Sequence, residues 1–321
     1  MIYRVAMKLG DAYGKEKRGY LASSRIRGHW VAKYWPECDD YFYPEEFNQT
    51  SEQFFDPQNQ LRLLRGYDVV IFNKAYEWRV AKKLKGIGIR IVVDFCDPDF
   101  LLSHSSAQRA ADCLKTLAFT DLAVVNGEPL KKALRKYFKK RIEVIPDRID
   151  LEGLPKKDSY DELRRIIWYG YSENLRVLEP YLKNVIDMGL EITIVSDKIG
   201  KPIILNDCKY PPKDRITFKV WQADSVNEQI ISHDVVFIGK DLDPYLSQFK
   251  SNNRAVLGWA LKMPVAWDIE DLKKLQSKEE RLKNAIEGNH MVRQKYDVRH
   301  SSFSYDIIIR DLLRDGKGSE L

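Results

Sequence analysis

Short apolar runs alternate with amphipathic stretches along the chain, and the whole pattern occurs twice in succession. Strands of a parallel sheet are near-continuous apolar runs, and the helices between them cover the sheet. The first series predicts strands over Ile2–Met7, Asp68–Phe72, Ile89–Asp94, Leu122–Val125 and Ile142–Ile145. The second series predicts strands over Ile166–Tyr169, Glu191–Val195, Ile216–Val220, Val235–Ile238 and Pro264–Trp267. The pattern therefore predicts two α/β domains in tandem.

The amphipathic stretches predict the helices that connect these strands. In the first series they are Ser24–Tyr34, Trp78–Lys85, Ala107–Thr116 and Glu128–Phe138. In the second they are Asn174–Met188, Ser225–Ser232 and Asn252–Leu261, followed by Lys274–Gly288 and Tyr305–Asp315. The polar stretch Leu151–Leu163 is typical of a linker. We therefore predict domains over residues 1–155 and 156–321, with a last helix that is free to return to the N-terminal domain.

The composition excludes several classes of protein. With 44% hydrophobic and 12% aromatic residues, the 321-residue chain is not expected to be disordered or of low complexity. The four cysteines form no C-x-x-C pair, and the five histidines have no ligand-like spacing, which argues against a disulfide framework and a metal site. No run approaches the roughly 18–20 apolar residues that cross a bilayer, and the N-terminus is unlike a secretory signal. We predict a cytoplasmic protein with no transmembrane segment.

The positive charge is concentrated in the first half of the chain. The net charge is +6, and residues 1–155 contain 26 Lys and Arg against 21 Asp and Glu, a net of +5. Such a balance suggests an anionic ligand, an anionic membrane surface or a nucleic acid. The most basic run, Lys131–Arg141, is also what a solvated helix face contains. No G-x-G-x-x-G follows the first strand, which argues against a dinucleotide-dependent dehydrogenase.

The most informative segment is Asp234–Trp267, which reads DVVFIGKDLDPYLSQFKSNNRAVLGWALKMPVAW. A buried strand leads through a polar loop to Lys250 and then to Ser251 or Asn252, either of which suits a helix N-cap. The backbone N–H groups of this helix start, the helix dipole, Lys250 and Arg254 together predict an anion site. A cation in the first turn is unfavourable to the helix itself, so Arg254 favours a ligand role over the alternative of a solvated helix start.

This segment resembles the C-terminal domain of GT-B glycosyltransferases, and is similar to members of glycosyltransferase family 4. Other matches follow in the family's order, over about residues 1–270. They are Ala22–Arg27 (ASSRIR), Asp94–Asp97 (DFCD), Ile145–Asp150 (IPDRID), Ile166–Gly170 (IIWYG) and Ile216–Trp221 (ITFKVW). The resemblance implies a GT-B fold, in which two Rossmann-like parallel-sheet domains face each other across a cleft.

The sequence also departs from the family pattern at several positions. Family 4 enzymes commonly carry two glutamates eight residues apart, and the corresponding positions here are Phe249 and Leu257. The arginine that follows the glycine of the first C-domain strand is Tyr171 here, and Arg176 is the nearest cation. The N-terminal loop carries separated glycines rather than a tight pair: Gly10, Gly14 and Gly19.

The resemblance implies transfer of a sugar from a nucleotide-diphosphate sugar to a hydroxyl group of a glycan or other acceptor, without a metal or resident cofactor. Cations and amide donors are needed where negative charge develops on the leaving diphosphate. We predict Lys250 and Arg254 for this catalytic role. The donor-binding residues predicted with them are Gly170, Tyr171, Arg176, Trp221, Ser251, Asn252 and Asn253. Trp221 and Tyr169 flank the nucleobase in this interpretation, although strand-end aromatics are also typical core residues.

On the acceptor side, Asp97 is the predicted general base or hydroxyl-orienting group, because it follows a strand directly. Asp94, Asp99 and His104 compete for that role, and Asp97 before Pro98 also suits a simple turn. Arg25 and Arg27 open the first helix after the first strand, and we expect them either near the cleft or on a surface helix.

Two alternatives to a glycosyltransferase with an unspecified acceptor remain at this point. The loss of both glutamates favours a GT-B protein that binds nucleotides or glycans without transfer. The basic N-terminal half suggests a glycosyltransferase that acts on modified DNA bases, for which a nucleic acid would be the partner. The nucleotide-sugar glycosyltransferase is the preferred hypothesis.

Overall fold

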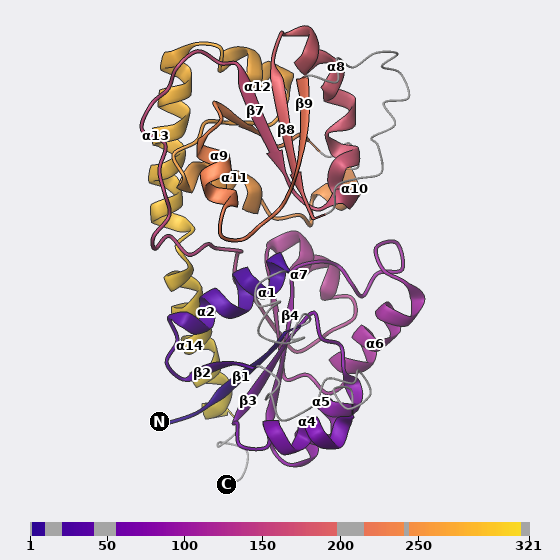
Figure 1. Ribbon diagram of the computed structural model, residues 1–321. Helices are drawn as coiled ribbons and strands as arrows, with labels where there is room; N and C mark the ends of the chain where they lie inside the picture. Colours follow the sequence, from indigo (N-terminus) through magenta and orange to yellow (C-terminus); the bar gives the residue numbers. More distant parts are fainter. Residues whose placement is uncertain (1, 10–20, 42–55, 198–214, 241–243, 316–321) are drawn as a thin grey trace. The chain divides into compact units, whose positions relative to one another are not determined.

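The computed structural model describes residues 2–9, 21–41, 56–197, 215–240 and 244–315 (Figure 1). Its contacts divide the chain into two compact units, which are described one at a time. The first unit contains Met1–Asp150, Gln248–Ser251 and Val298–Leu321. The second contains Leu151–Ser247 and Asn252–Asp297. The end of the chain therefore belongs to the first unit.

The first unit contains a six-stranded parallel sheet with the order β2-β1-β3-β4-β5-β6. The strands are β1 (Val5–Leu9), β2 (Cys38–Tyr41), β3 (Val69–Asn73), β4 (Arg90–Phe95), β5 (Leu122–Val125) and β6 (Arg141–Val144). The five strands predicted in this half are present, with ends shifted by up to three residues. Strand β2 was not predicted, because this four-residue edge strand contains two aspartates and has no apolar run.

Helices cover both faces of this sheet, and alternate strand residues point to opposite faces. Ala6 packs in the cluster that contains residues of α4 (Pro57–Leu64), α5 (Trp78–Gly86), α6 (Ala107–Leu117) and α7 (Glu128–Leu134). Val5 and Met7 pack in the opposite cluster, with residues of α2 (Trp30–Lys33) and α14 (Val298–Asp315). Figure 1 shows α14, in yellow, beside α2 near the N-terminus. Residues from both ends of the chain thus complete one core.

The predicted first helix is one continuous helical segment with three parts. These are α1 (Ala22–Ser24), a π-helical turn over Arg25–His29, and α2. Gly28 allows this segment to lie against β1, because an added Cβ would be 2.5 Å from the Leu9 side chain. The π turn changes the direction of the side chains that follow Ser24, and it places Ile26 and Arg27 in the interior.

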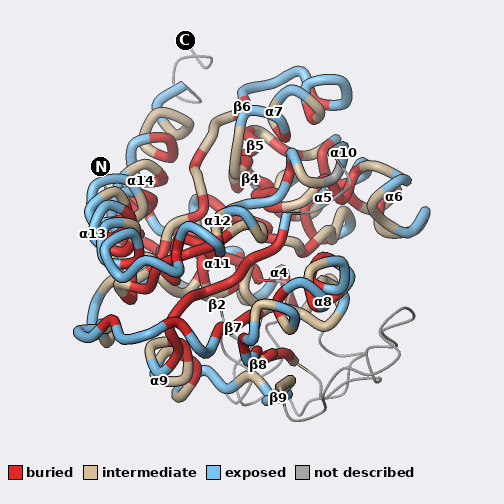
Figure 2. Tube along the Cα trace, turned by 90° about the horizontal axis from the view of Figure 1, so that it is seen from above, coloured by how far each residue is buried: buried red, intermediate tan, exposed pale blue. Residues whose placement is uncertain are grey.

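The second unit contains a five-stranded parallel sheet with the order β11-β10-β7-β8-β9. The strands are β7 (Arg165–Tyr169), β8 (Glu191–Ser196), β9 (Ile216–Val220), β10 (Val235–Phe237) and β11 (Val265–Ala266). The helical segments are η3 (Ser172–Val177), α8 (Glu179–Asp187), α9 (Val226–Ile231), α10 (Pro244–Ser247), α11 (Asn253–Ala260), α12 (Ile269–Lys274) and α13 (Lys278–Lys295). Figure 2 shows β7 and β8 mostly buried, whereas β9 at the edge is more exposed.

Two features of the described residues bear on where the protein could act. No helix among them is long and apolar enough to span a bilayer. Cys38, Cys96 and Cys113 are buried and form no disulfide with one another. The fourth cysteine, Cys208, and the glycines Gly10, Gly14 and Gly19 lie outside the described residues.

Candidate functional site

In the second unit, the carboxyl ends of β7, β8 and β10 meet at one edge of the sheet, where open parallel sheets bind ligands. Gly170 follows β7, and its N–H donates to the Val195 carbonyl at 3.1 Å, which extends the pairing with β8 by one residue. A Cβ at Gly170 would be 3.1 Å from the Trp168 ring and 3.6 Å from Cδ of Arg254. The glycine therefore leaves room for the arginine at this edge.

Arg254 lies in the first turn of α11 and is held by contacts on both its backbone and its side chain. The Tyr169 hydroxyl donates to the Arg254 carbonyl at 2.5 Å. Nη1 of Arg254 donates to the Ile238 carbonyl at 3.4 Å, just beyond β10, and the guanidinium lies 5.4 Å from the centre of the Trp168 ring. Burial raises the pKa of Tyr169 although the positive charge of Arg254 opposes it, so the phenol remains a donor. The result is an oriented cation at a half-buried position.

A carboxylate that the sequence analysis missed lies after the neighbouring strand. Asp197 directly follows β8 and accepts hydrogen bonds from the Ser172 N–H at 2.7 Å and from the Ser196 hydroxyl at 3.1 Å. Burial works to raise the pKa of Asp197, but these hydrogen bonds outweigh it and lower the pKa. Its position immediately after a predicted strand was the available signal. This anion is well suited to accept hydrogen bonds from hydroxyl groups of a ligand.

The other residues predicted for donor binding are distributed around this edge. Tyr171 precedes η3, and Arg176 lies in its last turn. The backbone N–H of Trp221 donates to the Ser196 carbonyl at 2.7 Å. The indole ring of Trp221 is partly buried and packs against the core. Asn252 donates through Nδ2 to the Tyr296 hydroxyl at 3.2 Å, and Asn253 opens α11.

The segment before α11 divides between the two units. Lys250 and Ser251 belong to Gln248–Ser251 of the first unit, whereas Asn252 to Arg254 belong to the second. Phe249 is 6% exposed and packs in the core of the first unit. Leu257 packs against a core cluster of the second unit. The two residues in place of the family's glutamates are thus packing residues, and the joint action of Lys250 and Arg254 stays a prediction.

In the first unit, the three aspartates after and within β4 have different surroundings. Asp94 is fully buried and accepts hydrogen bonds from Arg27, from Nδ2 of Asn73 at 3.1 Å and from the Tyr305 hydroxyl at 2.8 Å. Because Tyr305 belongs to α14, Asp94 joins the last helix to the sheet. Its carboxylate has a structural role.

Arg27 is the centre of this buried network. Its guanidinium donates to Asp94 at 2.7 Å, to Asp147 at 2.6 Å and to the Ile145 carbonyl at 2.8 Å. Burial alone would lower the pKa of Arg27, but the charges of Asp94 and Asp147 raise it well above its usual value. The interpretation of Arg27 as part of a solvated surface helix is wrong, because the residue is 3% exposed. Arg25, by contrast, is half-buried, and its guanidinium lies 5.5 Å from the centre of the Trp30 ring.

Asp99 is also buried, in a second network. It accepts hydrogen bonds from Arg109 at 2.8 Å, from the Tyr76 hydroxyl at 2.7 Å and from the Ser105 hydroxyl at 3.1 Å. Burial works to raise the pKa of Asp99, but the contacts with Arg109 and Tyr76 lower it overall. Nε2 of His104 is 3.9 Å from the same carboxylate, so His104 lies at the border of this network.

Asp97 differs from Asp94 and Asp99 because 30% of its side chain is exposed. It forms an ion pair with Lys74, which follows β3 and has a positive φ of 52°. Burial works to lower the pKa of Lys74, but the negative charges of Asp97 and Asp99 raise it overall, so Lys74 is a cation. The sequence analysis missed Lys74, although its place directly after a strand was the signal. The carboxyl ends of β3 and β4 therefore present an accessible carboxylate beside a fixed cation.

Both units thus have Rossmann-like parallel sheets with polar residues at the carboxyl ends of the strands, and the predicted GT-B fold class is confirmed. No family model and no curated protein matches the sequence. The Anabaena protein Alr3699/HepE, solved with UDP-glucose, superimposes with a TM-score of 0.70 at 11% identity, over 96% of this chain and 100% of that one. A DNA-modifying β-glucosyltransferase, solved with and without uridine diphosphoglucose, gives 0.53 at 13% identity, over 96% and 99%.

A third solved structure, an α,α-trehalose 6-phosphate synthase from Burkholderia multivorans, gives a TM-score of 0.53 at 12% identity over 83% of this chain and 74% of that one. At such identities these likenesses establish the fold. Membership of family 4 stays a prediction. Among the described residues, no three His, Cys, Asp or Glu side chains gather in a group that could hold a metal ion.

Proposed function

We propose that this protein is a glycosyltransferase that moves a sugar from a nucleotide-diphosphate sugar to a hydroxyl group of an acceptor. The observation that carries the proposal is the Arg254 guanidinium, held by the Trp168 ring and the Ile238 carbonyl beside Gly170. An oriented cation at a helix start, at the carboxyl edge of a parallel sheet, suits a diphosphate. The Anabaena neighbour of the same fold was solved with UDP-glucose, which supports a nucleotide sugar as the ligand class.

In the proposed reaction, the acceptor oxygen forms a bond to the anomeric carbon of the sugar. The bond from that carbon to the diphosphate oxygen breaks, and its electron pair stays on the leaving nucleoside diphosphate. Arg254, the N–H groups at the start of α11 and Lys250 stabilise the charge that develops there. This arrangement supplies positive charge without a metal. The acceptor proton passes to Asp97, whose carboxylate is accessible and whose orientation Lys74 fixes.

In this proposal, Asp197 accepts a hydrogen bond from a hydroxyl group of the donor. In glycosyltransferase family 4, a glutamate commonly has that role. Leu257 cannot accept a hydrogen bond through its side chain, and it packs against a core cluster. Asp197 is held as an anion by the Ser172 N–H at the end of the neighbouring strand. We assign it to a ribose or sugar hydroxyl of the donor.

The burial of Phe249 and the packing of Leu257 favour a second candidate, a GT-B protein that binds a nucleotide without transfer. The two candidates share the site at Arg254 and differ in turnover. A glycosyltransferase acting on modified DNA bases is a special case of the first candidate, distinguished by its acceptor.

Calorimetric titration with UDP, GDP and ADP tests the site. We expect one nucleoside diphosphate to bind, and Arg254→Ala to weaken its binding by about 10–100-fold, since a charge-assisted contact contributes roughly 1.5–3 kcal/mol. Arg164→Ala is the matched control, because this exposed arginine lies before β7 at the opposite edge of the same sheet and pairs with Glu162. Equal affinities in the wild type and in Arg254→Ala would refute the assignment of Arg254.

A further inference from the structure

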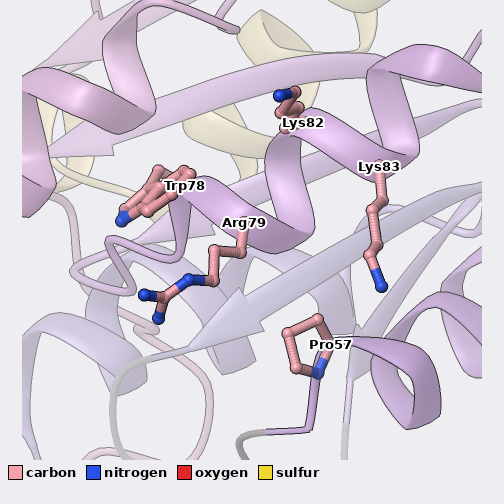
Figure 3. A pocket seen from close by; sticks show the side chains of 5 residues that line it. All are labelled: Pro57, Trp78, Arg79, Lys82 and Lys83. Carbon is pink, nitrogen blue, oxygen red and sulfur yellow. The ribbon is translucent and has the colours of Figure 1, made fainter.

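A basic hollow lies on the first unit, and none of the residues that line it is assigned to the reaction. It has a volume of about 450 Å³ and is lined by Pro57 at the start of α4 and by four residues of α5: Trp78, Arg79, Lys82 and Lys83. Figure 3 shows Arg79 and Lys83 extending from α5 on the side where Pro57 lies. Three of the five lining residues are cations. We call the lining residues together with Lys115 of α6 the α5 surface.

Within the described part of the chain, the cations of the α5 surface form no ion pair with an acid. No Asp or Glu occurs between Trp78 and Val93 in the sequence. Among the residues that the structure describes, Arg79, Lys82, Lys83 and Lys115 have no carboxylate within ion-pair distance. Nearby cations differ in this respect, since Lys85 and Arg90 lie 2.5 and 3.9 Å from the Asp121 carboxylate. Arg79 is three and four residues from Lys82 and Lys83, a spacing at which like charges destabilise a helix.

Trp78 fixes two of these cations in place. The Arg79 guanidinium lies 4.8 Å from the centre of the Trp78 ring, and the Lys115 ammonium lies 5.5 Å from it. A cation over an aromatic face loses part of its freedom before any ligand arrives. Arg79 also lies in the first turn of α5, where a positive charge is unfavourable to the helix dipole. Arg79, with Lys82 and Lys83 close to it, therefore lowers the stability of the helix. Arg79 and Lys115 are held in place for an anion by Trp78.

The geometry points to a linear polyanion rather than a membrane surface. The cations at positions 79, 82 and 83 follow one side of a helix, as a row of phosphate groups requires. The hollow is concave, and its apolar lining residues, Pro57 and Trp78, are half-buried. An anionic bilayer is typically bound by exposed apolar side chains that enter it beside the basic ones. None of the residues lining the hollow has such a side chain.

We propose that the α5 surface binds the phosphodiester backbone of a nucleic acid. Arg79, Lys82, Lys83 and Lys115 contact successive phosphates, and the Trp78 ring holds Arg79 and Lys115 in place for this contact. This binding is additional to the proposed glycosyl transfer and uses none of its residues. Of the three partners that the basic N-terminal half suggests, an anionic ligand, an anionic membrane surface and a nucleic acid, it selects the nucleic acid and places its binding on α5.

The test is fluorescence anisotropy of a labelled DNA duplex of mixed sequence, titrated with the full chain over a series of salt concentrations. The variant is Lys82→Glu with Lys83→Glu. The matched control is Lys132→Glu with Lys136→Glu, which changes the net charge equally at exposed cations on and just after α7 of the same unit. Circular dichroism establishes that both variants are folded, and UDP titration establishes separately whether the donor site is intact.

We expect the wild-type affinity to fall linearly with the logarithm of salt concentration. The α5 variant should bind about 10-fold or more weakly at low salt, with a salt slope smaller by about 2, because each lost phosphate contact removes about 0.9 from the slope. The control should change affinity by less than about threefold. Absent DNA binding, or equal losses in the two variants, would overturn the proposal. It would also fail if DNA binding were unchanged in the α5 variant while binding to phosphatidylserine vesicles was lost.

Discussion

At the scale of single residues, neighbours decide what each carboxylate can do. Asp94 and Asp99 are buried and hold arginines, whereas Asp97 keeps 30% of its side chain exposed beside Lys74. From their positions in the sequence alone, at or just after the end of one strand, these three aspartates could not be told apart. The difference arises from Arg27 and Tyr305, which are distant in sequence from Asp94, and from Arg109 on the helix that follows Asp99. Of the three carboxylates, Asp97 is therefore the one most accessible to solvent.

The role of Asp97 gives a prediction about kinetics. Asp97→Asn keeps the size of the side chain but removes its basicity, so we expect the rate of transfer to fall by about 10²–10⁴-fold. The affinity for the nucleoside diphosphate should change little, because Asp97 is assigned to the acceptor hydroxyl and not to the diphosphate. Initial transfer rates and calorimetric titration measure the two quantities. Asp112→Asn on α6 of the same unit is the control, and equal rates in both variants would exclude Asp97 as the base.

At the scale of elements, close approach between helices depends on small residues. Helices α11 and α13 pack against each other at Gly288, where an added Cβ would lie 2.1 Å from the Trp259 ring. The ring is fixed, because its Nε1 donates to the Asn284 side chain at 3.1 Å. Asn289 donates to the Trp259 carbonyl at 2.8 Å from the same side. Helix α11, which presents Arg254, is thus positioned by α13.

This contact predicts the effect of a single methyl group on stability. Gly288→Ala should lower the free energy of unfolding by about 1–3 kcal/mol, because the extra carbon forces the tryptophan out of place. Gly86→Ala is the control, since no atom lies within 4 Å of its added Cβ and alanine favours the helix. We expect that control to be neutral or up to about 1 kcal/mol more stable. Urea denaturation followed by circular dichroism measures both, and equal midpoints would refute the packing argument.

The elements also show how far sequence reasoning reaches. The apolar run Leu122–Val125 predicts both ends of its strand correctly, because a strand buried on both faces needs no polar position. Strand β2 and helix α4 were missed because neither has such a run, although Asp56 before Pro57 is a helix-start signal. The predicted helix over Asn174–Met188 is divided into η3 and α8, and Pro180 lies in the first turn of α8. Lys74 and Asp197 were missed because their partners, Asp97 and Ser172, follow neighbouring strands of the sheets. The sequence alone does not show which strands are neighbours.

At the scale of the whole molecule, the chain repeats one arrangement, a parallel sheet with polar residues after its strands. Alternating strands and helices imply parallel pairing with crossover connections, so the α/β class was predictable from the sequence. Long-range contacts were not. The contact of Tyr305 with Asp94 brings the last helix into the first unit, and no local pattern in either segment indicates it. The anion site at Arg254 was predicted from its helix start, whereas its partners Trp168 and Ile238 were visible only in the structure.

The most direct test of the central claim is turnover of a nucleotide sugar. The purified chain, with EDTA present, is incubated with UDP-glucose and other nucleotide sugars, with and without acceptors, and the released nucleoside diphosphate is measured over time. We predict release that exceeds one equivalent per protein and that falls by about 10-fold or more in Arg254→Ala, because that cation stabilises the leaving group. Binding of a nucleotide sugar with no release beyond one equivalent, for every donor and acceptor, would contradict the account and identify a binding protein.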